Sequence, residues 1–165
     1  MKKLFGLVMV FMFAAVMSHA TETLTAQGTA KAKIIQAATF VHASGAALDF
    51  GTIIPGANEG TVTLSAVATP TPVDNQIGGR TSDPVSSDHF VLGNLDTGVT
   101  YHVSVPASVT ITNANSDTMS VALTGSDTDV TGVTSKDIYV GGVLTVGASQ
   151  AVGEYEGNYT VTVTY

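Results

Sequence analysis

Apolar and polar residues alternate in short stretches along most of this chain, and the clearest example is its last segment. From position 159 to 165 the order is Tyr-Thr-Val-Thr-Val-Thr-Tyr, so that Tyr159, Val161, Val163 and Tyr165 can face a core while the threonines face water. An alternation with a period of two is typical of an antiparallel strand with one buried face. We therefore expect these four residues to form a C-terminal core strand.

The same pattern recurs between turn residues, and helical periodicity is absent from the chain after its first twenty residues. Gly, Asn, Asp, Ser and Pro separate short β-branched, apolar stretches, as in an all-β domain. We predict a single immunoglobulin-like antiparallel β-sandwich of about eight or nine strands, because two packed sheets cover each other's apolar faces without helices. The predicted strands are Leu24 to Ile35, Ala38 to His42, Ala47 to Ile54, Thr61 to Ala66, His89 to Leu92, Thr100 to Val105, Met119 to Leu123, Ile138 to Val146 and Tyr155 to Tyr165.

The segment from Val67 to Ser87 differs from the rest of the chain. It contains Pro70, Pro72 and Pro84 together with two glycines and several Asp and Ser residues. Because proline cannot donate to a strand ladder, we expect a long surface loop here. Long loops in compact domains often bind ligands, so this loop is one candidate contact surface.

The first twenty residues have the three parts of a secretory signal peptide. Lys2 and Lys3 are followed by an apolar stretch from Leu4 to Met17 and by the small residues of Ser18-His19-Ala20. The apolar stretch of about 14 residues is shorter than the roughly 20 needed to span a bilayer. We expect cleavage after Ala20, which gives a signal peptide over 1–20, a single domain over 21–165 and no membrane span in the mature protein.

Composition narrows the class of protein further. The chain has no cysteine, which excludes a disulfide framework and a lipid attached to cysteine. The formal net charge is −7, and loss of Lys2 and Lys3 leaves four basic residues against 13 acidic ones, a charge of −9. Nucleic acids and anionic membrane surfaces require clustered Lys and Arg, so we expect neither as a partner.

No arrangement of residues predicts catalysis, a cofactor or a metal site. His42, His89 and His102 have no second His or Cys within four positions, and no Gly-x-Ser-x-Gly motif occurs. Asp127, Asp129 and Gly132 match the first half of a calcium loop, but Ile138 stands where the bidentate Glu is required. Turn capping by these residues and those at 113–117 is the simpler interpretation, and weak calcium binding between turns stays an alternative.

Several segments in order along the chain resemble the exported bacterial family catalogued as domain of unknown function 4402. The ending, Gly-x-Tyr-x-Gly followed by alternating Thr and Val, and the early Leu-x-Phe-Gly are also similar to the subunits of archaic chaperone-usher pili and spore coat U proteins. The segments that carry the first resemblance are Ala26 to Ile35, Leu48 to Gly51, Gly60 to Leu64, Phe90, Tyr101 to Pro106, Met119, Val140 to Val146 and Gly153 to Tyr165.

The pilin resemblance implies that an N-terminal extension of one subunit completes the sandwich of the next by strand addition. The candidate extension is Glu22 to Lys33, with Leu24, Ala26, Gly28, Ala30 and Ala32 on one face. This face is small, because alanine buries little apolar area. The alternative is that the same segment pairs within its own domain and gives a complete, monomeric sandwich.

Three functions follow as hypotheses. The first is a non-enzymatic structural or surface subunit, which associates with itself or with related surface subunits by strand addition and is assisted by a periplasmic chaperone. The second is a self-contained adhesin or glycan-binding module that uses the loop from Val67 to Ser87 or the turns around Asn113 to Asp117. The third is an enzyme, for which the sequence offers no motif. Each hypothesis places the protein outside the cytoplasm, in the periplasm, at the cell surface or in the medium.

Overall fold

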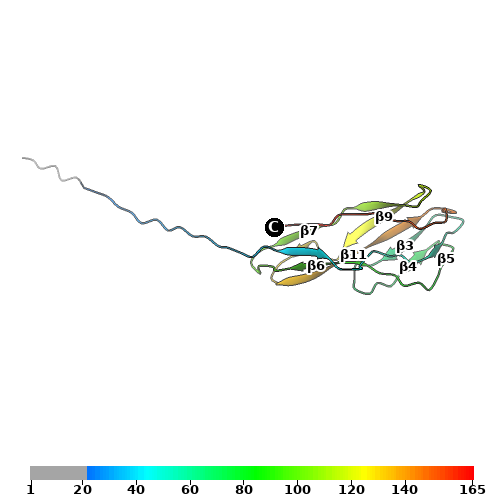
Figure 1. The fold of residues 1–165 in the computed structure, drawn as a ribbon, viewed down its shortest axis with the longest axis horizontal. Helices are drawn as coiled ribbons and strands as arrows, with labels where there is room; N and C mark the ends of the chain where they lie inside the picture. The colour runs from blue at the N-terminus through cyan, green and yellow to red at the C-terminus, as the bar shows by residue number, and fades with distance from the viewer. Residues whose placement is uncertain (1–21) are drawn as a thin grey trace, which may run out of the picture. The chain divides into compact units, whose positions relative to one another are not determined.

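The computed structural model describes residues 22–165, so the predicted signal peptide lies outside the described residues. The chain divides into two units, Met1–Lys33 and Ile34–Tyr165. Residues 22–165 contain twelve strands and no helix, and all twelve lie in the second unit. The prediction of an all-β, antiparallel fold is confirmed (Figure 1).

A seven-stranded sheet is built around one long central strand, β11 (Ser135–Val146). On one side of β11, β6 (Asp88–Gly93) pairs with its first half and β3 (Gly60–Leu64) pairs with its second half. On the other side, β9 (Thr118–Gly125) pairs with residues 140–145 of β11. The remaining strands extend this sheet outward and are β1 (Thr39–His42) beside β6, β4 (Val73–Asn75) beside β3 and β8 (Ser108–Thr112) beside β9.

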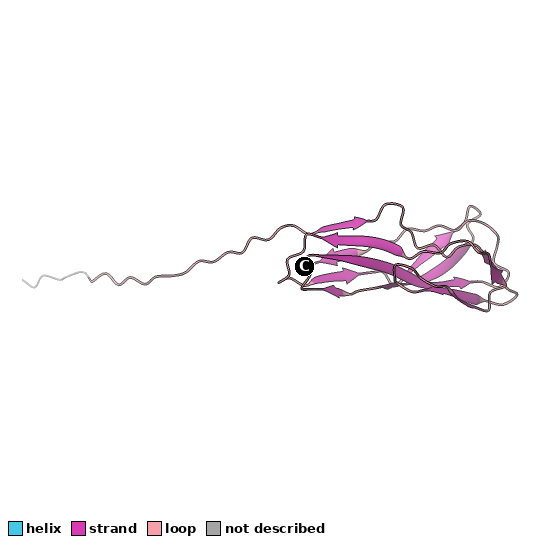
Figure 2. Ribbon diagram, turned by 90° about the horizontal axis from the view of Figure 1, so that it is seen from below, coloured by secondary structure: helices cyan, strands magenta, loops and turns pink. Residues whose placement is uncertain are grey.

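A second, three-stranded sheet has the order β10 (Asp129–Val130), β7 (Tyr101–Ser104) and β12 (Thr162–Thr164). A short pair, β2 (Ile53–Ile54) with β5 (Gly79–Arg80), lies apart from both sheets. All of these pairings are antiparallel. Figure 2 shows the strands lying roughly along one common axis of the domain.

Both sheets contribute side chains to one hydrophobic core. Alternation along β3 buries Val62 and Leu64, and alternation along β7 buries Tyr101 and Val103. Residues from two sheets in one cluster mean that the sheets pack face to face, as in a sandwich. The other buried apolar residues are Phe50, Leu92, Leu95, Val121, Leu123, Val130, Ile138, Val140, Leu144, Val146 and Val161.

Six of the predicted strands coincide with β1, β3, β6, β7, β9 and β11. The predicted strand from Leu24 to Ile35 is wrong for this chain, because no strand precedes Thr39 in the described residues. A face of alanine and glycine offers little apolar area to stabilise such a strand. The predicted loop from Val67 to Ser87 contains two short strands, β4 and β5, which pair with strands outside the segment. Short strands β8 and β10 were not predicted.

Candidate functional site at two open sheet edges

The first open edge belongs to β12. The order β10-β7-β12 leaves the outer side of β12 without a partner strand in residues 22–165. The N–H of Val103 donates to the carbonyl of Thr128 at 2.7 Å, on the β10 side of β7. Because successive residues direct their backbone groups to alternate sides, Val163, which lies opposite Val103, directs its N–H and C=O outward.

The second open edge belongs to β1, which pairs only with β6 within the described chain. The N–H of Ala43 donates to the carbonyl of His89 at 2.9 Å, so Ala43 faces β6. Alternation then directs the backbone groups of Phe40 and His42 outward. The Phe40 ring stacks on Phe90, with centroids 5.4 Å apart, and packs against the core behind this edge.

The four residues of the predicted C-terminal core strand take different positions. Val161 is buried at 9% exposure, and Tyr159 and Val163 are half-buried and pack against the core. Tyr165 is 62% exposed, although its ring lies 5.0 Å from that of Tyr101. A regular strand forms only over Thr162–Thr164, and Glu156 makes an isolated bridge with Thr112.

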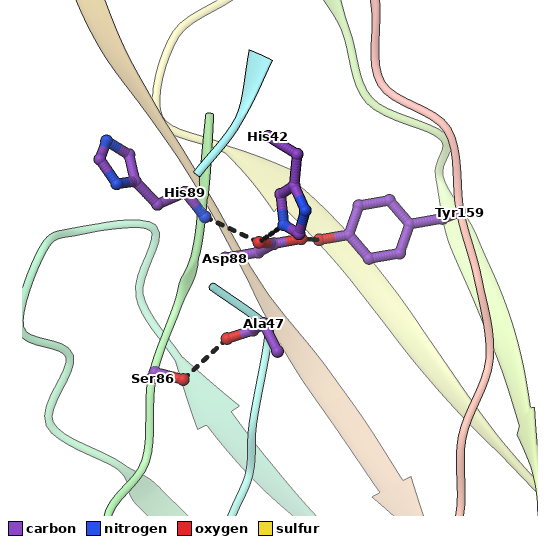
Figure 3. A network of polar contacts seen from close by, with 6 residues as sticks. All are labelled: His42, Ala47, Ser86, Asp88, His89 and Tyr159. Carbon is purple, nitrogen blue, oxygen red and sulfur yellow. Dashed lines mark hydrogen bonds and ion pairs between the residues drawn. The ribbon is translucent and has the colours of Figure 1, made fainter. Parts of the chain in front are cut away.

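A buried carboxylate connects the two edges. Asp88 of β6 is 6% exposed, and its carboxylate meets the side chains of His42 and Tyr159 (Figure 3). Its Oδ1 lies 2.6 Å from Nε2 of His42 on β1 and accepts the N–H of His89 at 2.8 Å. Its Oδ2 accepts the hydroxyl of Tyr159 at 2.6 Å. Burial raises the pKa of the Tyr159 phenol, and the hydrogen bond to Asp88 and the charge of Asp88 raise it further.

Sequence reasoning missed Asp88, and it found no metal-site signature at His42. A signal was present in the alternation of β6, where Asp88 occupies the same face as Phe90 and Leu92. A polar residue on an apolar face requires hydrogen-bond partners, since an unsatisfied buried carboxylate is costly. The partners lie 46 and 71 positions away in the chain, and no local pattern could name them.

The other two candidate histidines also pair with aspartates on neighbouring strands. His89 contacts Asp137 at 2.9 Å and stacks on Tyr139, and the Nδ1 atom of His102 lies 2.5 Å from Asp129. No group of three or more His, Cys, Asp or Glu side chains in residues 22–165 is arranged to hold a metal ion.

The candidate calcium residues serve structural contacts. Asn113 caps its own turn, since its Oδ1 accepts the N–H groups of Asn115 and Asp117, both at 2.9 Å. Asp127 forms an ion pair with Lys136 at 2.9 Å. These contacts use the Asn and Asp oxygens within the turns.

The candidate strand-donor residues lie in the first unit. Leu24, Ala26, Gly28, Ala30 and Ala32 are all exposed and belong to no strand, with Leu24 at 93% exposure. Their alternation is therefore available to a partner, and a role in strand addition is a proposal taken up below.

Within residues 22–165, no helix is long and apolar enough to cross a membrane.

Comparisons with known proteins place the chain in a family. The search of curated proteins found no match. A family model described as a domain of unknown function (DUF4402) matches residues 39–165, from the first residue of β1 through β12. This match covers well over half of the chain, so the protein belongs to the DUF4402 family.

Proposed function

We propose that this protein is an exported, non-enzymatic structural subunit that associates with further copies of itself by β-strand addition. The observation that carries the proposal is the outward-facing backbone of β12 at Val163, in a chain whose alternating segment 22–32 belongs to no strand. In strand addition, such a segment from one copy pairs with the open edge of another.

The small side chains of the donor face suit an acceptor edge whose own side chains already pack against the core. Phe40, Tyr159 and Val163 pack against the core at the two edges. A donor with alanine and glycine side chains adds little volume beside them, and its backbone supplies net hydrogen-bond energies of about 0.5–1.5 kcal/mol each. Leu24 is the one large apolar residue on that face, and its burial contributes about 1.5–3 kcal/mol.

Charge also favours association between copies. The segment 22–33 carries Lys31 and Lys33 against Glu22, a net charge of +1. Residues 34–165 carry two basic residues, Arg80 and Lys136, against the other 12 of the 13 acidic ones, a net charge of −10. Opposite charge on donor and acceptor speeds their encounter and weakens as salt is added.

The experiment compares two purified chains, 22–165 and 34–165, by light scattering over a range of concentrations. We expect 22–165 to form concentration-dependent polymers and 34–165 to remain a folded monomer that binds a peptide of residues 22–33. Monomers of 22–165 at every concentration, together with no peptide binding by 34–165, would overturn the proposal.

Matched peptides test whether alternation determines binding. Ala26→Asp with Ala30→Asp places two charges on the donor face, and Thr25→Asp with Thr29→Asp places the same charges on the opposite face. We expect the first peptide to lose binding and the second to retain it, because only the first buries carboxylates. Equal binding by both peptides would show that the alternation of the donor face does not determine binding.

Export is tested separately. We expect the mature protein to begin at Thr21, to leave the cytoplasm and to use a periplasmic chaperone that covers the open edge before assembly. Mass spectrometry of the protein from fractionated bacterial cells identifies its N-terminal residue. An intact Met1 in the cytoplasmic fraction would contradict the export part of the proposal.

One observation favours the alternative of a self-contained binding module. The turn at Asn113 and Asn115 borders an open hollow of about 490 Å³, together with Val152, Glu154 and Glu156. In a monomeric binding module, the ligand would bind in such a hollow. A glycan array probed with the 34–165 chain and with its Asn115→Ala variant tests for glycan binding in the hollow. Binding by the unchanged chain that the variant loses would support the alternative function.

A further inference from the structure

We infer that Asp88 is a positioning residue for the acceptor edge, and this inference rests on the proposed function. The carboxylate ties β1 and the segment before β12 to the same point of β6. It thereby fixes β1 and the segment before β12 relative to each other, next to the two edges that can receive an incoming strand.

Asp88 places a carboxylate in an apolar part of the core. Its side chain is 8% exposed and shares a strand face with Phe90 and Leu92, of which Leu92 is fully buried. A carboxylate in such a place destabilises the fold unless several donors satisfy it. Apolar side chains would close this part of the core more simply, so a cluster that reaches both edges indicates a use beyond core packing.

Of the two side chains that contact Asp88, one belongs to the open edge strand β1 and the other to the segment that leads into β12. His42 is the last residue of β1, and its backbone groups point away from β6. Tyr159 lies two positions before Val161, and its phenol crosses the interior to Oδ2 of Asp88. Figure 3 shows His42 and Tyr159 meeting at this one carboxylate, the tyrosine from the C-terminal segment and the histidine from β1.

The segment 157–161 is held by side-chain packing, with Val161 buried in the core and Tyr159 packed against it, rather than by strand pairing. It forms no strand, and the backbone hydrogen bonds between Thr112 and Glu156, at 2.9 and 3.1 Å, come just before it. The strand pairs of β12 begin after it, at Thr162. Between these anchors, the Tyr159 contact holds the backbone of Val161 in place relative to β1. A donor that pairs with the β12 edge therefore binds to a preorganised backbone, which lowers the entropy lost on binding.

The test uses the 34–165 chain, the 22–33 peptide and two variants. Tyr159→Phe keeps the ring and removes only the hydroxyl, and Asp88→Asn keeps an oxygen acceptor but loses the charge. We expect each variant to weaken peptide binding by about tenfold or more, since a buried charge-assisted hydrogen bond is lost or weakened. Asp137→Asn is the matched control, because it changes a His–Asp pair at His89, where Asp137 is 59% exposed, and we expect its peptide affinity to be unchanged.

Stability and affinity are measured on the same samples, well below the unfolding temperature. A purely structural role would lower the unfolding temperature of the variants and leave peptide affinity equal to that of the unchanged domain, and this result would overturn the inference alone. An unchanged domain that binds no peptide would overturn the proposed function, and the inference with it. Ala43 and Thr164 direct their N–H groups toward β6 and β7. Faster amide hydrogen exchange at both residues in Tyr159→Phe supports the inference, and unchanged exchange at both contradicts it.

Discussion

Tyr159 and Asp88 lie 71 positions apart in the chain, and the phenol oxygen of Tyr159 is 2.6 Å from Oδ2 of Asp88. The pair joins the segment before β12 to β6 of the opposite sheet. Because the tyrosine must stay protonated to donate this hydrogen bond, the pair carries a proton at a pH where an exposed tyrosine has lost it.

Alkaline titration should reveal this proton. The pKa of Tyr159 in the folded state is raised above the ordinary value of 10.0, so the unfolded chain releases this proton first. The contribution to the free energy of unfolding is present below about pH 10 and decreases as the pH rises above it. We expect chemical denaturation between about pH 9 and 11 to show this decrease, and Tyr159→Phe to remove that part of it. A slope that is unchanged in the variant would contradict the assignment.

The core should respond to leucine truncation according to burial. Leu92 is fully buried, whereas Leu24 is 93% exposed. Leu92→Ala should lower the free energy of unfolding by about 2–5 kcal/mol, because it removes apolar contacts and leaves a cavity. Leu24→Ala is the matched control and should change unfolding of the monomer by less than about 0.5 kcal/mol. Urea denaturation at low protein concentration compares the two variants. Equal decreases in the free energy of unfolding would contradict the placement of Leu92 in the core and of Leu24 in an exposed segment.

Gly141 of β11 should tolerate no side chain. A Cβ atom there would lie 2.3 Å from the carbonyl oxygen of Leu64 and 2.6 Å from the amide nitrogen of Ala66. Because both contacts are with backbone, β3 would have to move away from β11. We expect Gly141→Ala to lower the free energy of unfolding by about 1–3 kcal/mol or more. An unfolding midpoint equal to that of the unchanged chain would show that the strands are farther apart.

Arg80 of β5 should stabilise the folded conformation of the 67–87 segment. Its guanidinium contacts both carboxylate oxygens of Asp74, at 3.0 and 3.1 Å, and donates to the carbonyl of Phe50 at 2.8 Å. Lysine cannot make this forked contact. We expect Arg80→Lys to lower the free energy of unfolding by about 1–2 kcal/mol and to increase proteolysis within 67–87. Cleavage at an unchanged rate would mean that β4 and β5 hold the segment without it.

The sequence predicts best the strands with a sustained alternation and a buried face. In β3, Val62 and Leu64 alternate with threonines, and both are in the core. The period of two carries this information locally, so no partner strand has to be known. The all-β class could be inferred for the same reason.

Strands that depend on their partners could not be found in this way. The two residues of β5 pair with Ile53 and Ile54, and nothing in Gly79 or Arg80 alone indicates a strand. The segment from Leu24 to Ile35 fails in the opposite direction, because it alternates well but has a face too small to stabilise a strand without a partner. The Asp88 cluster combines residues from three distant segments, so only the folded chain brings it together.

The length of β11 has a consequence for the time course of folding. This strand pairs with β6, β3 and β9, and Gly60 meets Val146 in one of these ladders. No stable sheet can close around its centre until residue 146 has emerged, because the central strand comes late in the chain. Pairings that are distant in sequence form slowly, typically in milliseconds to seconds for all-β domains. Under the export proposed above, a chain that enters a translocation pore N-terminus first would stay open for most of its passage, because its central strand enters late.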